Sequence, residues 1–185
     1  MKAQDQYYTA DGGEDIERDI AAGGEPMIPH VAALVARAPA ISVYDYWQLN
    51  KAKAAAQKAY LDKWRNLRSP ISNHEADILL TPTMPHSAVP HRACKWVGYT
   101  KVWNFLDYTA AVLPAGKVDK TLDSRKNEPS TAKYVPRNKL DEWNWGLYDP
   151  ESMDGLPLSV QIVGRRLEEE KVLGAAAVIE SIMRR

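Results

Sequence analysis

The chain has 185 residues, 45% of them hydrophobic, and its 24 basic and 24 acidic side chains give a formal net charge of zero. That length supports one domain with a real core rather than two. The balanced charge excludes a nucleic-acid partner from our expectations, because phosphate backbones are held by a surplus of Lys and Arg. No membrane is expected as a partner either, since no apolar run approaches the length of a membrane span.

The first residues, Met1 to Asp5, are polar and lack the apolar stretch of a secretory signal. Cys94 is the only cysteine, which excludes an internal disulfide and a C-x-x-C metal site. A single thiol fits a reducing compartment. We therefore expect a cytoplasmic protein.

Three helices are predicted in the first half of the chain. The first covers residues 15–22 and ends at Gly23-Gly24, and the second runs from Pro29 to about Arg37. The third covers residues 43–67, with Ser42 as its N-cap. Its apolar face is predicted from helical spacing to consist of Tyr46, Leu49, Ala56, Tyr60 and Leu67.

Three strands are predicted further along. Residues 77–81 form a short apolar run without alternation, which predicts a strand covered on both faces. Residues 110–113 and 156–163 are the other two candidates. Helices are predicted at 99–108 and 168–183, and the proline-rich stretch 82–92 as an ordered loop.

A long irregular insertion is predicted at about 119–155, where no convincing element is visible. Its second half carries Trp143, Trp145 and Tyr148, which we expect to pack onto another part of the protein. Strands alternating with helices indicate an α/β fold. Three strands are few for a sheet, so the parts resemble one side of a larger structure.

No catalytic or metal centre is visible from residue patterns. His86 and His91 lie five residues apart in the proline-rich loop, without the spacing or the further ligands of a zinc site. Loop structure or hydrogen bonding explains them better. Cys94 has no visible base partner and is interpreted as an ordinary thiol.

Six stretches in order nevertheless carry a resemblance. They are YTADGG (8–13), GGEP (23–26), ISVYDYWQL (41–49), DILLTPTMPH (77–86), WNFLDY (103–108) and GLPLSVQIVG (155–164). Together they resemble the C-terminal third of fungal acetamidases, members of the amidase-signature family. The resemblance covers essentially the whole chain.

The resemblance implies an α/β fold in which helices flank a mixed sheet. Residues 1–185 would form a single partial domain, the C-terminal part of that fold, and would be incomplete on their own. It implies hydrolysis of small aliphatic amides to carboxylate and ammonia, through a serine nucleophile, a second serine with a cis peptide and a lysine. It implies no metal and no organic cofactor. The family's C-terminal part lines the substrate pocket, so the resemblance suggests a pocket wall at Trp103, Asn104, Asp107 and Tyr108. The alternative is that these four residues only cap and pack.

The sequence departs from the family in its chemistry. It has no Ser-Ser pair and no Gly-Gly-Ser stretch, so no catalytic residue is carried over. We expect an amidase segment that is inactive alone, with Met1 marking a truncated product, a split gene or an abbreviated gene model. One alternative is a subunit that complements a separate catalytic half or pairs with itself. Another is a non-catalytic module that binds a small amide. The strands at 78–81 and 157–163 are expected to lack neighbours on one side, which would promote aggregation.

Overall fold

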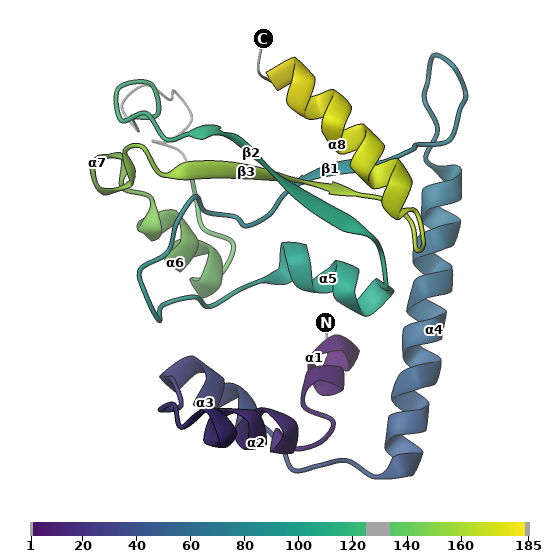
Figure 1. Cartoon of the computed structure of the whole chain (residues 1–185), viewed down its shortest axis with the longest axis vertical. Helices are drawn as coiled ribbons and strands as arrows, with labels where there is room; N and C mark the ends of the chain where they lie inside the picture. Colours follow the sequence, from purple (N-terminus) through teal and green to yellow (C-terminus); the bar gives the residue numbers. More distant parts are fainter. Residues whose placement is uncertain (1, 125–133, 184–185) are drawn as a thin grey trace. The chain divides into compact units, whose positions relative to one another are not determined.

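A computed structural model describes residues 2–124 and 134–183, with side chains from Gln4 onward (Figure 1). The chain divides into two compact units. The first contains Met1–Ala76, His91–Cys94 and Phe105–Asp107, and the second contains Asp77–Pro90, Lys95–Asn104 and Tyr108–Arg185. The expected single partial domain over 1–185 stays a prediction.

The first unit is helical: α1 (Lys2–Tyr8), α2 (Glu14–Gly23), α3 (Pro29–Val35) and α4 (Val43–Asn66). The sequence predicted α2, α3 and α4, and these are confirmed. Gly24 ends α2 in the left-handed conformation, with φ of 65°. The Ser42 hydroxyl accepts a hydrogen bond from the Asp45 backbone N–H at 3.1 Å, as expected of an N-cap.

The buried face of α4 differs in part from the prediction. Tyr46 and Leu67 at its two ends are exposed, and Trp64 is its most buried side chain. The indole of Trp64 donates a hydrogen bond to the Ala76 carbonyl at 2.8 Å. Leu67 and Ala76 are also joined, by a backbone bond of 2.9 Å, so the segment that folds back after the helix determines which side is covered.

The second unit contains a three-stranded sheet in the order β1-β3-β2, with β1 (Leu79–Pro82), β2 (Ala110–Lys117) and β3 (Pro157–Val163). Both pairings are antiparallel. The three predicted strands are confirmed. The expectation that residues 157–163 would lack a neighbour is wrong, because β3 is the central strand. Among the described residues, β1 and β2 are the outer strands.

The two faces of the sheet are covered by different helices (Figure 1). Ile162 is 0% exposed and packs with Val172 and Ala176 of α8 (Glu169–Met183). Gln161 points to the opposite face, because successive residues of a strand alternate. There its side-chain amide donates a hydrogen bond to the Tyr99 carbonyl of α5 (Gly98–Leu106) at 2.9 Å.

Strand β1 is not covered on both faces within the described structure. Burial alternates along it, and Leu80 is 56% exposed. The prediction failed because β1 is an outer strand with one exposed face. A strand of four residues is too short for its sequence pattern to reveal that exposure.

The predicted irregular insertion is also wrong in part, because it contains α6 (Lys139–Leu147) and α7 (Pro150–Met153). The Asn138 side chain accepts hydrogen bonds from the backbone N–H groups of Leu140 and Asp141, both at 3.0 Å. Asp149 caps α7 in the same manner. These caps fix two short helices whose apolar pattern is too brief to predict them. Residues 125–133 of the insertion lie outside the described residues.

None of the helices in the described ranges is both long and apolar enough to cross a membrane.

Candidate functional site

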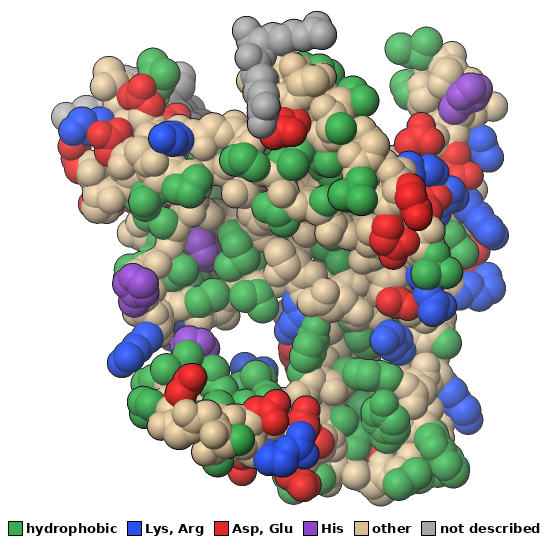
Figure 2. Space-filling view, in the orientation of Figure 1, with side chains coloured by type: hydrophobic (Ala, Val, Ile, Leu, Met, Phe, Trp, Pro, Cys, Tyr) green, Lys and Arg blue, Asp and Glu red, His purple; other side chains and the backbone are tan. Residues whose placement is uncertain are grey.

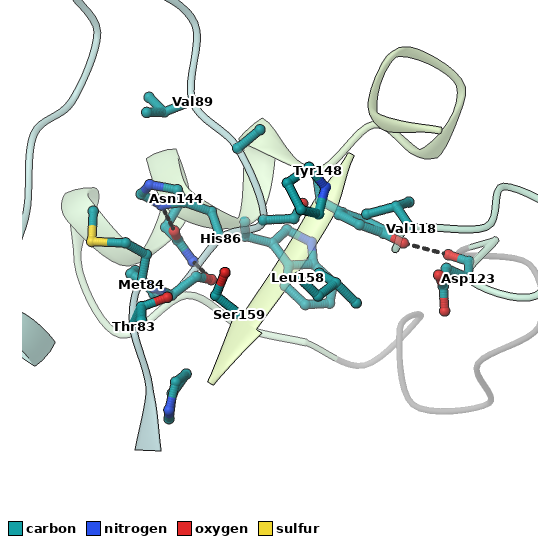
Figure 3. Close-up of a pocket in the computed structure, with 16 residues that line it drawn as sticks. Thr83, Met84, His86, Val89, Val118, Asp123, Asn144, Tyr148, Leu158 and Ser159 are labelled. Atoms are coloured by element: carbon teal, nitrogen blue, oxygen red, sulfur yellow. Dashed lines mark hydrogen bonds between the residues drawn. The ribbon is translucent and has the colours of Figure 1, made fainter. Parts of the chain in front are cut away.

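A cavity of about 580 Å³ lies within the second unit (Figure 3). Its walls come from four parts of the chain: the loop from Pro82 to Val89, the segment after β2 with Val118 and Asp123, the α6 region from Asn144 to Tyr148, and the start of β3. Figure 3 shows Leu158 and Ser159 on β3 between His86 and Asn144 at one end and Val118 and Asp123 at the other. The predicted loop is therefore ordered, and it forms one wall of a hollow.

Gln161 holds the loop where it leaves the sheet. Its amide nitrogen lies 2.9 Å from the Thr81 hydroxyl and 3.3 Å from the Pro82 carbonyl, in addition to its bond to Tyr99. Gln161 is only 2% exposed, and a buried amide is costly unless its hydrogen bonds are made. It therefore acts as a fixed anchor between β1, β3 and α5.

Asn144 of α6 joins the helix to the loop. Its amide nitrogen donates to the Pro85 carbonyl at 3.2 Å, and its oxygen lies 3.0 Å from Nδ1 of His86. Because the donation to Pro85 fixes the orientation of the amide, the oxygen faces His86 and accepts from Nδ1–H. The imidazole also meets the ring of Trp143 edge to face, with centroids 5.9 Å apart. His86 thus has a structural role, as its sequence context indicated.

Two aromatic side chains complete the α6 wall. Trp145 lines the cavity, and its indole stacks on Tyr134 with ring centroids 4.1 Å apart. The Tyr148 hydroxyl donates to the Asp123 carbonyl at 2.7 Å. The expectation that the aromatic residues of this segment pack onto other parts of the protein is confirmed.

Ionic groups lie at the start of α6, where Asp141 is close to Tyr134 and Arg137. Hydrogen bonds from the Arg137 backbone and from Tyr134 lower the pKa of the Asp141 carboxyl. In the segment after β2, hydrogen bonds from the backbone N–H groups of Thr121 and Leu122 lower the pKa of Asp119. Asp119 is exposed and Asp141 is partly buried, and both carboxylates accept hydrogen bonds from nearby backbone N–H groups, so neither is poised as a proton carrier.

The chemistry available in this part of the protein is limited. Hydroxyl groups of Thr83, Ser87 and Ser159 line the cavity, and Ser87 donates to the thioether of Met153 at 3.2 Å. A thioether is a weak acceptor and cannot activate a nucleophile as a base does. No cluster of His, Cys, Asp and Glu suited to a metal ion occurs among the residues that the structure describes.

Comparison with known proteins decides the family. Residues 14–173 match the amidase family. The chain belongs to the amidase family. It is 56% identical over 183 residues to Amidase 1 of Gibberella moniliformis, covering 99% of this chain and 34% of that protein. It is 36% identical over 179 residues to an acetamidase of Aspergillus oryzae, covering 96% of this chain and 32% of that protein.

A solved structure of fatty acid amide hydrolase has the same fold, with a TM-score of 0.81 over 97% of this chain and 31% of that chain. At 24% sequence identity this likeness establishes the fold alone. The predicted amidase-signature fold and the resemblance to fungal amidases are confirmed. The chain spans about a third of the length of the amidases that it matches.

The four residues suggested as a pocket wall of the amidase lie elsewhere. None of them lines the described cavity. Trp103 is 6% exposed and stacks on Tyr108, with ring centroids 6.1 Å apart, whereas Asn104 and Asp107 are exposed. Asp107 belongs to the first unit and the other three to the second. Their role in a substrate pocket stays a prediction.

Sequence reasoning missed Asn144, Trp145 and Tyr148 as cavity residues, because it placed them in an irregular segment. One signal was available. Asn138 stands three residues before Asp141, and Asp149 directly precedes Pro150. Both arrangements are typical of helix starts. Two helix starts here would have predicted an ordered wall.

Proposed function

We propose that this chain forms part of an amidase that hydrolyses small aliphatic amides, acetamide among them, to carboxylate and ammonia. One observation carries the proposal: 99% of the chain aligns with an amidase, at 56% identity, while spanning 34% of that relative. The acetamide specificity is supported by two relatives named acetamidase, from Aspergillus oryzae and Emericella nidulans, at 36% and 37% identity.

We further propose that the nucleophile and proton relay come from outside these 185 residues. Hydrolysis through an acyl-enzyme needs a hydroxyl activated by a neighbouring base. The Ser87 hydroxyl donates to the sulfur of Met153, and Nδ1 of the His86 imidazole is engaged by Asn144, so neither pair is a hydroxyl held by a base. In this proposal the cavity forms only part of the substrate pocket, and the chain alone is inactive.

Ammonia release tests this proposal. The purified 185-residue chain is expected to release none from acetamide above the blank. Co-expression with the remaining two thirds of a relative such as Amidase 1 is expected to restore turnover. The control is the same co-expression with the nucleophilic serine of the added part changed to alanine. Ammonia release by the pure chain would refute the proposal that it is inactive alone.

A second candidate is a non-catalytic subunit that complements a separate catalytic half or pairs with itself. Large apolar side chains are exposed on α8 (Leu173, Val178 and Ile182) and at Leu80 of β1. Figure 2 shows hydrophobic side chains gathered on the surface over α8. Exposed apolar side chains of this size are the observation that favours an interface here. Co-purification with a separately expressed catalytic half would support this candidate. A chain that stays monomeric and does not bind that half would contradict it.

We propose a cytoplasmic location as well. The support is the single cysteine, which fits a reducing compartment. Cell fractionation of the tagged protein tests it, and recovery in an organelle or membrane pellet would contradict it.

A further inference from the structure

One side of α4 carries an exposed stripe of side chains at helical spacing. Tyr44, Trp47, Lys51, Ala55 and Lys58 follow one another at intervals of three or four residues, which places them on one side of the helix. All five are exposed, Tyr44 at 66% and Trp47 at 59%. We call these five residues the α4 stripe. The described part of the chain leaves this stripe open.

Two aromatic residues distinguish the α4 stripe from an ordinary solvated face. Such a face carries charged and polar residues, whereas Tyr44 and Trp47 leave large rings in water one turn apart. Trp and Tyr are enriched among the residues that supply the binding energy of protein interfaces. Lys51 follows one turn later and makes no ion pair with any residue that the structure describes, while Lys58 is paired with Asp62. The stripe therefore joins an apolar anchor to an unpaired cation.

The opposite charge is found on α2, in the same unit as α4. Glu14, Glu17 and Ala21 share one side of α2, and all three are exposed. Neither glutamate has an ion-pair partner in the described ranges, because the basic residue of this helix, Arg18, is engaged by Asp15. We call these three residues the α2 face. Figure 2 shows acidic side chains over α2 and basic side chains along α4.

The α2 face and the α4 stripe match in spacing. Trp47 and Lys51 are four residues apart, which is a rise of about 6 Å along the helix axis. Ala21 and Glu17 are four residues apart as well. With the two helices antiparallel, the small side chain of Ala21 meets the indole of Trp47. The same register brings the carboxylate of Glu17 to the ammonium group of Lys51, and Glu14 lies one turn beyond.

A second copy of the chain supplies this partner. Within one chain the stripe is exposed, so α2 of the same chain does not occupy it. The formal net charge is zero, so two copies do not repel one another as a whole. Trp and Tyr beside Lys also suit an anionic lipid surface. Such lipids would repel the acidic α2 face of the same unit, which favours the second copy.

We propose that the α4 stripe is a docking surface for the α2 face of a second copy of this chain. Trp47 is its apolar anchor, and the pair of Glu17 and Lys51 fixes the register. An exposed ion pair contributes little affinity, so Trp47 supplies most of the binding and Lys51 the specificity. The contact is small, and we expect a Kd of about 10–100 µM. The inference does not rest on the amidase function.

Analytical ultracentrifugation of the 185-residue chain tests whether it pairs. Between about 1 and 300 µM the sedimentation coefficient is expected to rise from that of a monomer to that of a dimer. Because the register depends on opposite charges, association should weaken when the salt concentration rises from about 50 to about 500 mM. A chain that stays monomeric over this range, or one that pairs equally at both salt concentrations, would overturn the inference.

Charge reversal locates the interface. Lys51→Glu and Glu17→Lys should each weaken the dimer at least about tenfold, because each places like charges opposite one another. The double variant restores the opposite charges and should recover the dimer. Lys63→Glu makes the same change outside the stripe and is expected to have no effect, and it should not rescue Glu17→Lys. A double variant of Lys51 and Glu17 that stays as weak as either single variant would overturn the assignment.

Truncation of the anchor separates this surface from other apolar ones. Trp47→Ala should weaken the dimer at least about tenfold, whereas Leu173→Ala on α8 should leave it unchanged. Circular dichroism checks the folding of both surface variants. A dimer kept in Trp47→Ala but lost in Leu173→Ala would place the interface on α8 and overturn the proposal.

Vesicles containing phosphatidylserine test the lipid alternative. The dimer is expected to stay in solution when these vesicles are pelleted. Pelleting of a monomeric chain, abolished in Trp47→Ala, would assign the stripe to a membrane surface and overturn the proposed pairing of two copies.

Discussion

The two ends of β3 have different surroundings although they belong to one strand. Gln161, Ile162 and Val163 are buried, with α8 packed on one face and α5 on the other. Pro157, Leu158 and Ser159 are exposed to the cavity or to solvent. The alternation of side chains is the same at both ends. What covers the strand, and not its pattern, therefore decides whether a position becomes core or cavity wall.

The two regions are also stabilised by different interactions. The core end depends on close apolar packing around Ile162, together with one buried amide, Gln161. The cavity end depends on helix caps and on hydrogen bonds such as that from Asn144 to Pro85. Packing contributes more per residue than a partly exposed cap. The core end should therefore respond more strongly to substitution.

The largest effect is expected for Ile162→Ala. Removing this fully buried side chain leaves a cavity between β3 and α8, so the free energy of unfolding should fall by about 4 kcal/mol. Urea denaturation measures it. The milder Ile162→Val should cost about 1 kcal/mol. A loss of less than about 1 kcal/mol in Ile162→Ala would show that α8 does not cover the strand as described.

Gln161→Leu comes next. The apolar side chain fits the buried position but leaves the Thr81, Pro82 and Tyr99 acceptors without their donor, which should cost about 2–3 kcal/mol. Since those acceptors include the start of the cavity loop, amide hydrogen exchange in the loop should quicken as well. Hydrogen exchange and urea denaturation together measure both effects. Loss of stability with unchanged exchange in the loop would mean that the loop is held by other contacts.

Asn138→Ala should cost about 1 kcal/mol, because α6 loses its N-cap. The matched variant Ser42→Ala removes the cap of α4 at a similar cost. Only Asn138→Ala is expected to quicken amide hydrogen exchange in the loop from Pro82 to Val89, since Asn144 of α6 donates to the Pro85 carbonyl and α4 does not line the cavity. Similar exchange of that loop in both variants would contradict the contact between α6 and the loop.

The smallest effect is expected at Glu168, before α8. Burial alone would raise the pKa of this carboxyl, but hydrogen bonds from Arg165 and Lys171 outweigh it and hold the pKa at about 2, below the ordinary 4.5. The stabilisation is therefore complete above pH 4.5 and is lost as the pH falls toward 2. Glu168→Gln should be slightly destabilised at neutral pH, and its difference from the unaltered chain should vanish in acid. Glu170→Gln serves as control, and an equal pH dependence in both variants would contradict this assignment.

Much of the fold was predictable because its signals are local. Ser42 predicted the start of α4, Gly24 the end of α2, and alternation the strand that became β3. Three short helices were missed: α1, α6 and α7. The last two have caps but no long apolar pattern. The covered face of α4 was predicted only in part, since Trp64 is buried by a segment that follows the helix.

The sequence by itself determined the family, most helix and strand positions, and the lack of a paired serine motif. These follow from residue identity and spacing along the chain. Only the tertiary structure decided that β3 is central, that Leu80 faces open space, and that His86, Asn144 and Trp145 surround one cavity. Those features depend on contacts between residues nearly 60 positions apart, such as the one between His86 and Asn144. Periodicity reports which side of an element is apolar, whereas the partner that covers that side is fixed only when the chain folds.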